Sequence, residues 1–121
     1  MAQLAEQQGV NRRLDPRIQP SEGWIDIEGL RYEVCDVSVS GVLIRPYAGN
    51  HQVGASFEFR LHLRDDDNSE VVIDGGAVVV RVTPSEIAAQ FFHLDSDQYP
   101  LFDAYLERQY ASRTSGPIVK H

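Results

Sequence analysis

Between Gly23 and Leu94 the chain holds six runs typical of β-strands, separated by glycine-, proline- or aspartate-rich breaks, and in three of them, residues 24–28, 30–34 and 57–63, apolar and polar residues alternate with a period of two. Successive side chains of a β-strand point to opposite faces, so such runs predict strands with one buried and one solvated face. The expected strands cover residues 24–28, 30–34, 41–45, 57–63, 70–82 and 87–94.

The breaks between the runs predict turns of different kinds. Gly29 separates the first two runs by a single residue and indicates an antiparallel hairpin. Gly75 and Gly76 interrupt the fifth run and indicate a bend or bulge, as needed where a sheet curls into a barrel. The segment Asp65–Ser69 predicts a hairpin tip with solvated charges. Its contiguous aspartates lack the alternating ligands and the glycine bend of a calcium loop.

After Leu94 the period changes to that of a helix. Asp95–Asp97 is typical of a helix cap, and Pro100 then falls in the first turn, where its missing N–H costs little. Seven residues form the expected apolar stripe against the sheet: Tyr99, Leu101, Phe102, Tyr105, Leu106, Gln109 and Tyr110. Six short strands followed by one helix predict an all-β fold, a six-stranded antiparallel barrel with a C-terminal helix.

The two ends of the chain are expected to lie outside the barrel. Residues 1–22 are polar and without periodicity, and Pro16 and Pro20 disfavour a helix there, so we expect a flexible arm. A helix over Ala2–Gln8 would be marginal at that length. Residues 23–111 are expected to form the barrel and its helix, and residues 112–121 a frayed tail.

The charge pattern indicates a binder of small anions. The net charge of −7 argues against non-specific binding of DNA or RNA. Ten of the eleven basic residues are arginines, which bind planar anions with two parallel hydrogen bonds. Arg12, Arg13 and Arg17 fall within six positions. A simple solvated basic arm remains an alternative on composition alone.

Composition also narrows the class of protein. At 121 residues we expect one domain, and a single cysteine, Cys35, excludes an intrachain disulfide and a cysteine-based zinc cluster. No apolar run has the length of a membrane span, and Met1–Val10 lacks the features of a signal peptide, so we expect a cytoplasmic protein without membrane insertion.

Catalysis is not expected. The histidines are scattered without metal-ligand spacing, and no nucleotide-hydrolase or nucleophile motif is present. Cys35, on an expected strand with no identifiable base, is expected to be a buried, inert thiol. Asp26 with Glu28, or Asp65 with Asp67, are the nearest approach to paired catalytic carboxylates, and both pairs are expected to be solvated. We therefore expect no catalytic residue, no metal and no cofactor.

Two short motifs carry the candidate chemistry. Arg13 and Arg17 supply guanidinium groups that match phosphate oxygens and the O6/N7 edge of guanine. In Asp36–Gly41, Asp36 and Ser38 are two positions apart and would share one face of an extended segment beside Gly41. A carboxylate can accept hydrogen bonds from the opposite edge of guanine. A purely structural turn is the alternative for this second motif.

Together the motifs resemble the signature of PilZ domains, bacterial receptors for cyclic di-GMP, in which RxxxR is followed by [D/N]xSxxG. Arg13 and Arg17 fill the first element, and Asp36, Ser38 and Gly41 the second, with 18 residues between Arg17 and Asp36. The resemblance covers roughly residues 11–110 and implies a six-stranded barrel with a C-terminal helix.

The resemblance also implies a function: binding cyclic di-GMP and signalling to a protein partner in motility, pilus or exopolysaccharide control. It implies phosphate and guanine contacts for the arginines, guanine contacts for Asp36 and Ser38, and a role for Arg12 in binding a second ligand molecule. Because 121 residues leave no room for an output domain, we expect the protein to act on an unidentified effector.

The sequence departs from the family pattern on the far wall of the expected pocket. Ala88 stands about where many members have a glycine, and the only tryptophan, Trp24, is too early to stack on a ligand from a later strand. The alternatives are a degenerate PilZ-like module that acts only through protein contacts and, less well matched, an oligonucleotide-binding barrel, which would need exposed aromatics along a basic groove.

Overall fold

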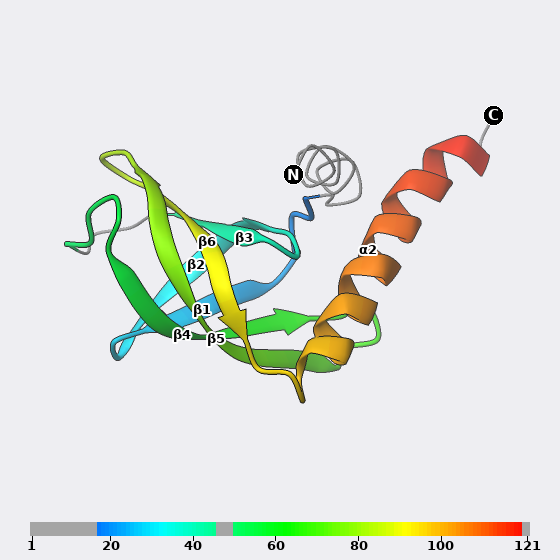
Figure 1. Cartoon of the computed structure of the whole chain (residues 1–121). Coiled ribbons are helices and arrows are strands. Elements are labelled where there is room, and N and C mark those ends of the chain that lie inside the picture. Colours follow the sequence, from blue (N-terminus) through cyan, green and yellow to red (C-terminus); the bar gives the residue numbers. More distant parts are fainter. Residues whose placement is uncertain (1–16, 46–49, 120–121) are drawn as a thin grey trace, which may run out of the picture.

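The computed structural model describes residues 17–45 and 50–119, and from residue 113 onward only the course of the backbone. The strands close into an antiparallel barrel in the order β1-β2-β3-β6-β5-β4, with a helix after the last strand (Figure 1). The elements are β1 (Gly23–Ile27), β2 (Leu30–Val37), β3 (Gly41–Ile44), β4 (Ser56–Arg64), β5 (Glu70–Val82), β6 (Ile87–Leu94) and α2 (Tyr99–Val119). The predicted six-stranded barrel with a C-terminal helix is confirmed.

The first hairpin forms as the glycine break predicts. Ile27 pairs with Leu30, so the loop is only Glu28 and Gly29. Both residues have positive φ, 52° and 83°, as a two-residue turn that follows the twist of the strands requires. Glycine adopts this conformation without the steric cost that Glu28 bears.

The predicted irregularity at Gly75-Gly76 is also present. The pairing of β5 with β6 shifts register between Gly76 and Ala77, and Phe92 of β6 is the residue left without a partner there. A Cβ atom on Gly75 would lie 2.4 Å from the carbonyl oxygen of His93, so β6 approaches β5 too closely for any side chain. The glycines therefore let the long strand β5 bend between its two neighbours.

The barrel interior is filled by the inward-facing residues of all its strands. Fully buried aliphatic residues come from every strand: Ile25 and Ile27 of β1, Val34 and Val37 of β2, Val42 and Ile44 of β3, Leu61 and Leu63 of β4, Ile73 of β5 and Ile87 of β6. At the end nearest α2, Phe59 of β4 contacts Phe91 of β6, and Phe91 contacts Phe102 of the helix. This aromatic chain joins the helix to the barrel core.

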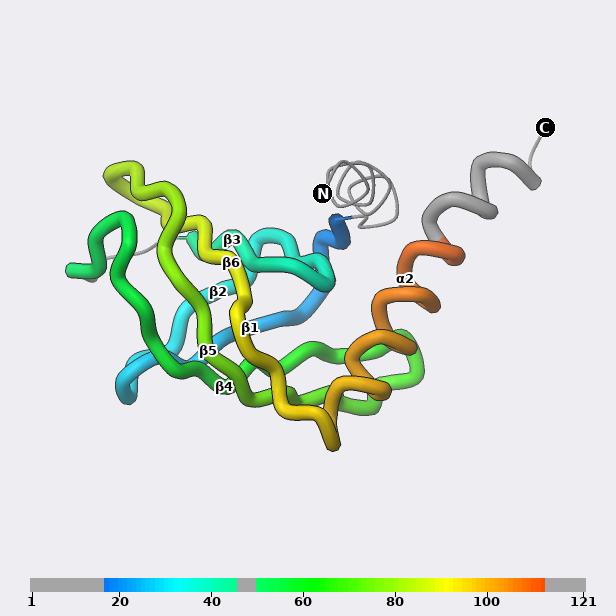
Figure 2. Tube along the Cα trace, viewed as in Figure 1, coloured from blue at the N-terminus to red at the C-terminus, as the bar shows by residue number. Residues whose placement is uncertain are grey.

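Helix α2 closes one end of the barrel and lies beside the β4–β5 hairpin (Figures 1 and 2). Phe102, Tyr105, Leu106 and Gln109 are buried, which confirms the centre of the predicted stripe. Leu101 and Tyr110 were expected on the same face, but both are exposed. Leu101 and Tyr110 lie at the two edges of this stripe, so the face of α2 that contacts the barrel is narrower than the sequence suggests.

The ends of α2 confirm one prediction and correct another. The carboxylate of Asp95 accepts the backbone N–H groups of Asp97 (2.9 Å) and Gln98 (3.3 Å), so the predicted cap is present. The helix, however, runs to Val119, and the expected start of a frayed tail at Ser112 is wrong. Residues 112–115 contain neither glycine nor proline, so nothing local stops the helix there.

The hairpin tip between β4 and β5 differs from its prediction in one residue. Asp65 is 8% exposed rather than solvated. Its carboxylate accepts hydrogen bonds from the guanidinium of Arg108, through Nε at 3.0 Å and also through Nη2, and from Gln109 Nε2 at 3.1 Å. The tip folds against α2, where Asp66 also accepts a hydrogen bond from Gln109 Nε2 at 3.2 Å. Asp66 and Asp67 are exposed, as expected.

Candidate functional site

The two motifs meet at one ion pair. Arg17 Nη1 donates to Asp36 Oδ1 at 2.6 Å, although the residues are 19 positions apart. The neighbouring backbone sets this contact: Ile18 and Val37 exchange two N–H···O bonds of 2.8 Å, and Ile18 is 1% exposed. The end of the predicted flexible arm, from Arg17 onward, is therefore fixed to the end of β2.

A bulge directs Asp36 toward this contact. The pairing of β2 with β3 shifts between Val34 and Asp36, which leaves Cys35 without a partner in the ladder. Cys35 is half-buried rather than buried, and Arg45 Nη2 lies 2.6 Å from its sulfur. The expectation of a buried thiol is wrong, because the bulge turns this residue away from the core.

Ser38 occupies a different position from the one expected. Strand β2 ends at Val37, so Asp36 and Ser38 do not form one face of an extended segment. Ser38 is 1% exposed, and its hydroxyl lies 3.2 Å from that of Ser40 and accepts the Ser40 N–H at 3.3 Å. The Ser38 N–H donates to the Gly41 carbonyl at 2.9 Å. Ser38 thus shapes the β2–β3 turn and positions Ser40.

Gly41 is required by the packing of two strands. A Cβ atom there would lie 2.4 Å from the carbonyl oxygen of Ala89 in β6. Its φ is not positive, so the conformational freedom of glycine is not what the site uses. The missing side chain lets β3 and β6 approach each other at the wall of the site.

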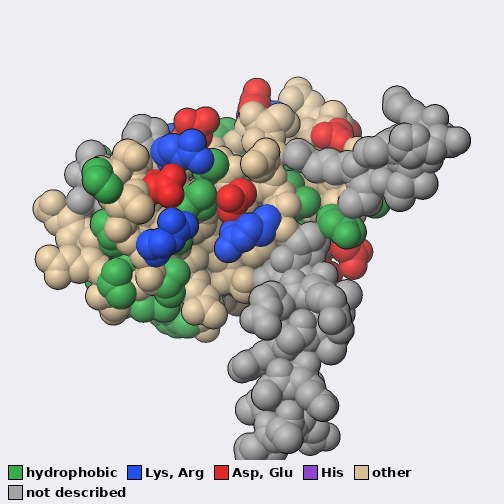
Figure 3. All heavy atoms as spheres, turned by 90° about the horizontal axis from the view of Figure 1, so that it is seen from above, with side chains coloured by type: hydrophobic (Ala, Val, Ile, Leu, Met, Phe, Trp, Pro, Cys, Tyr) green, Lys and Arg blue, Asp and Glu red, His purple; other side chains and the backbone are tan. Residues whose placement is uncertain are grey.

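A cavity of about 340 Å³ lies over these residues. It crosses four neighbouring strands of the barrel, from the end of β2 over β3 and β6 to β5. Its lining comprises Arg17, Asp36, Ser40, Gly41, Val42, Leu43, Val80, Arg81, Ala88, Ala89 and Gln90. On the face of the molecule shown in Figure 3, basic and acidic side chains lie next to one another.

The far wall of this cavity is what sequence reasoning missed. Val80 and Arg81 come from β5, and Gln90 from β6. They lie next to the motif only because β6 and β5 follow β3 around the barrel, an order that the chain's linear sequence does not reveal. Ala88, the position noted for its departure from the family pattern, is part of the lining.

The remaining predicted site residues are not in the cavity. Arg12 and Arg13 lie outside the described residues, so their roles stay predictions. Trp24 does not line the cavity; its ring stacks on that of His62 with centroids 5.2 Å apart.

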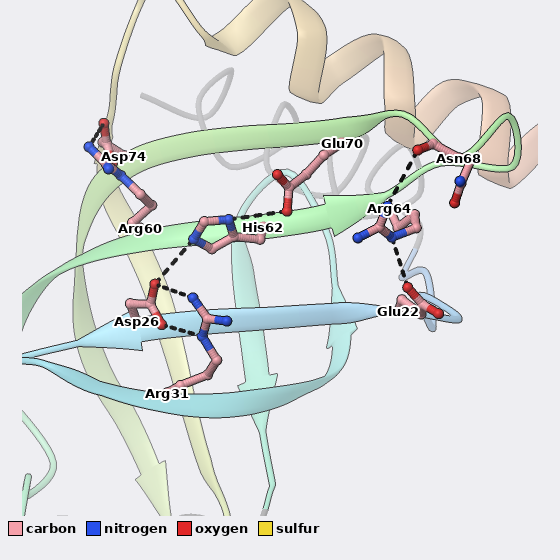
Figure 4. Close-up of polar contacts among 9 residues, drawn as sticks. All are labelled: Glu22, Asp26, Arg31, Arg60, His62, Arg64, Asn68, Glu70 and Asp74. Atoms are coloured by element: carbon pink, nitrogen blue, oxygen red, sulfur yellow. Dashed lines mark hydrogen bonds and ion pairs between the residues drawn. The ribbon is translucent and has the colours of Figure 1, made fainter.

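A second polar cluster lies on the outer surface of β1, β2, β4 and β5 (Figure 4). Asp26 accepts two hydrogen bonds from Arg31, at 2.8 and 3.1 Å, and lies 3.1 Å from His62 Nε2. The hydrogen bonds from Arg31 lower the pKa of Asp26, against the opposing effect of burial. A carboxylate held charged in this way is not suited to act as a general acid. Within the described part of the chain, no cluster of residues could hold a metal ion.

Comparison with known proteins confirms the fold. No family model and no curated protein sequence matches the chain. Among solved structures, the chain is similar to the Bacillus subtilis inhibitor of motility (MotI/DgrA), a PilZ-domain protein, with a TM-score of 0.63 and 21% sequence identity. The chain has the PilZ-type barrel fold. The match covers 82% of this chain and 51% of the other, so the chain spans about half the length of that protein.

Within the PilZ-type barrel, the cavity and the Arg17–Asp36 pair lie on the outside of the strands rather than in the closed interior, which the core residues fill. Among the described residues, no helix has the length and apolar character needed to span a membrane.

Proposed function

We propose that this chain is a receptor for cyclic di-GMP that binds the nucleotide in the cavity over β3 and β6. The observation that carries the proposal is the contact between Arg17 and Asp36, which brings an arginine of RxxxR and the aspartate of DxSxxG to the same cavity. Neither motif is specific alone, and their spatial convergence is what a shared ligand requires.

The chemistry of the cavity supports an anionic nucleotide. Arg17 uses one terminal nitrogen for Asp36, and its guanidinium has further N–H groups to donate to phosphate. Asp36 has a second carboxylate oxygen to accept N–H groups of guanine. The lining holds two arginines and one aspartate, which gives it a positive balance within a protein of net charge −7.

The size of the cavity is compatible with a small-molecule ligand. A volume of about 340 Å³ lies at the lower end of the range of small-molecule sites. Arg12 and Arg13 precede Arg17 by only a few residues in the sequence, and we propose that they too bind the ligand. Ordering the arm would cost entropy, so we expect affinity on the order of micromolar.

The output is proposed to be a protein–protein signal rather than a chemical reaction. Ligand binding would order the arginine arm against the barrel and so create a surface that a cytoplasmic partner recognises. Regulation of motility is the first pathway to test, since the similar structure is that of an inhibitor of motility.

Isothermal titration of cyclic di-GMP into the purified protein tests the proposal. GTP and cyclic di-AMP, titrated in the same way, are the controls for selectivity. We expect selective, saturable heat that Arg17→Glu abolishes. Arg60→Glu is the matched control: Arg60 is equally exposed and also pairs with an aspartate, Asp74 at 2.7 Å, but it does not line the cavity. Absence of heat in the wild-type protein would leave a PilZ-like module that acts only through protein contacts.

The stoichiometry of the same titration tests Arg12. A ratio of two ligand molecules to one chain is expected if Arg12 contacts a second nucleotide, and Arg12→Ala should then reduce the ratio to one. A ratio of one in the wild-type protein would contradict this role.

A further inference from the structure

Arg81 of β5 lies at the opposite end of the cavity from Arg17 and Asp36. Strands β3 and β6 separate β2 from β5, so three strand spacings lie between the two ends. Neighbouring strands are about 4.8 Å apart, which makes the separation roughly 14 Å along the sheet before the side chains reach inward. Long, exposed arginine side chains at the two ends of the cavity can reach inward, so the guanidinium groups of Arg17 and Arg81 can approach two phosphate groups of one ligand from opposite sides.

Arg81 is held only loosely by its own neighbours. Its side chain is 58% exposed, and Nη1 lies 3.6 Å from Glu86 Oε1, beyond hydrogen-bond distance. The other oxygen of Glu86 lies 3.3 Å from Nε of Arg45. Glu86 would therefore keep a cationic partner if Arg81 turned toward a ligand, so the movement leaves no carboxylate unpaired.

The surface next to Arg81 is suited to a flat ring. Ala88 of β6 pairs with Arg81 on one side and with Leu43 of β3 on the other. Its methyl group leaves room above the strand that a larger side chain would fill. A base resting on Ala88 would have the Arg81 guanidinium beside it and Gln90 two residues further along the same strand.

We propose that Arg81 is a second anion contact of this site and that it selects ligands with two phosphate groups over ligands with one. This inference rests on the proposed function and adds a residue that belongs to neither motif. Arg17 binds one phosphate at the β2 end, and Arg81 binds the other at the β5 end. The specificity for a dinucleotide then comes from two arginines that approach the ligand from different strands.

The test compares cyclic di-GMP with cyclic GMP, which has the same base and one phosphate. Arg81→Ala removes one charge-assisted contact, so we expect this variant to bind cyclic di-GMP about tenfold more weakly than the wild-type protein. Binding of cyclic GMP should be the same in Arg81→Ala and in the wild-type protein. Arg60→Ala is the control for removing an equally exposed arginine outside the cavity and should leave both ligands unaffected.

Glu86→Gln provides an independent arm, because it weakens the hold on Arg81 without touching the cavity lining. We expect Glu86→Gln to bind cyclic di-GMP as tightly as the wild-type protein or a few-fold more tightly, and the double variant to bind like Arg81→Ala. If Glu86→Gln strengthens binding of cyclic di-GMP in the Arg81→Ala background as much as it does in the wild-type background, the inference is wrong.

The outcomes separate this inference from the proposed function. Suppose that the wild-type protein binds cyclic di-GMP. If Arg81→Ala then binds cyclic di-GMP equally well, or if it loses affinity for cyclic GMP as much as for cyclic di-GMP, Arg81 is not a second phosphate contact. The proposed receptor function stands in either case. If the wild-type protein binds no cyclic di-GMP, both proposals fail.

Discussion

Arg17 and Asp36 are joined by a hydrogen bond of 2.6 Å at the rim of a cavity, and each belongs to a different short motif of the sequence. The contact follows from the backbone bridge between Ile18 and Val37, which fixes the chain just after Arg17 onto the last residue of β2. The pair therefore holds the side chain of Arg17 at the end of β2.

The Arg17–Asp36 pair should matter for binding and little for stability. Arg17 is 58% exposed, and exposed ion pairs contribute about 0–1 kcal/mol. We expect Asp36→Asn to weaken cyclic di-GMP binding about tenfold, through loss of a charge-assisted contact. Its urea midpoint should remain close to that of the wild-type protein. Asp74→Asn, which breaks a similar pair with Arg60 outside the cavity, should leave binding unchanged. Equal affinity of both variants would remove Asp36 from the site.

Gly41 should be needed for the fold before it is needed for the ligand. In Gly41→Ala the new methyl would lie 2.4 Å from the backbone oxygen of Ala89, and a backbone atom cannot move aside cheaply. We expect a loss of about 1–3 kcal/mol in the free energy of unfolding, typical of overpacking. Chemical denaturation measures it.

A second glycine separates packing from backbone conformation in that experiment. Gly54 has a positive φ of 93° but open space around its Cα, so Gly54→Ala tests conformational strain alone. A Gly41→Ala variant as stable as the wild-type protein would show that β3 and β6 can separate at this point.

The strands were predictable from alternation in β1, β2 and β4 and from runs of β-branched and aromatic residues in the others, and the hairpin at Gly29 because its loop chemistry is local. The order in which the strands close into a barrel was not predictable, because it depends on which edge strands pair. For the same reason the sequence did not predict that Val80 and Arg81 form the far wall of the cavity. Residue types identified Arg17 and Asp36 as site residues, but their direct contact depends on the bridge at Ile18.

Two local predictions failed because tertiary contacts overrode them. Asp65 was expected to be solvated like its neighbours, but the docking of α2 buries it against Arg108 and Gln109. Ser38 was expected to lie in an extended segment, but β2 ends at Val37. In the turn to β3, the Ser38 hydroxyl accepts a hydrogen bond from the Ser40 N–H. In both cases the contacts that the fold creates around the side chain, and not its residue type, decide its environment.

Asp65 should stabilise the docking of α2 on the β4–β5 hairpin. Its carboxylate is nearly buried and accepts hydrogen bonds from both Arg108 and Gln109 of α2. We expect Asp65→Ala to lower the free energy of unfolding by about 1 kcal/mol, since it removes the hydrogen bonds from the half-exposed Arg108 and from Gln109, which keeps its contact with Asp66. Glu107→Ala, on the exposed side of the same helix, is the control. Similar urea midpoints for the two variants would mean that α2 is held by its apolar face alone.

The cluster around Asp26 predicts how stability depends on pH. Hydrogen bonds from Arg31, with smaller contributions from His62, lower the pKa of Asp26 below its ordinary value of 3.8. A lowered pKa in the folded state means that the contribution to stability is complete above the unfolded-state value, near 4, and is lost as the pH falls through the folded-state value.

We therefore expect the stability of Asp26→Asn to fall less steeply than that of the wild-type protein as the pH drops below about 4, because the variant has no proton to bind at this position. Urea unfolding between pH 2.5 and 7, followed by tryptophan fluorescence, measures the difference, with Trp24 as the intrinsic probe next to His62. Glu33→Gln, an exposed carboxylate of the neighbouring strand, is the control and should follow the wild-type curve. Parallel curves for Asp26→Asn and the wild-type protein would show that the Arg31 contact is too screened by solvent to favour the charged form.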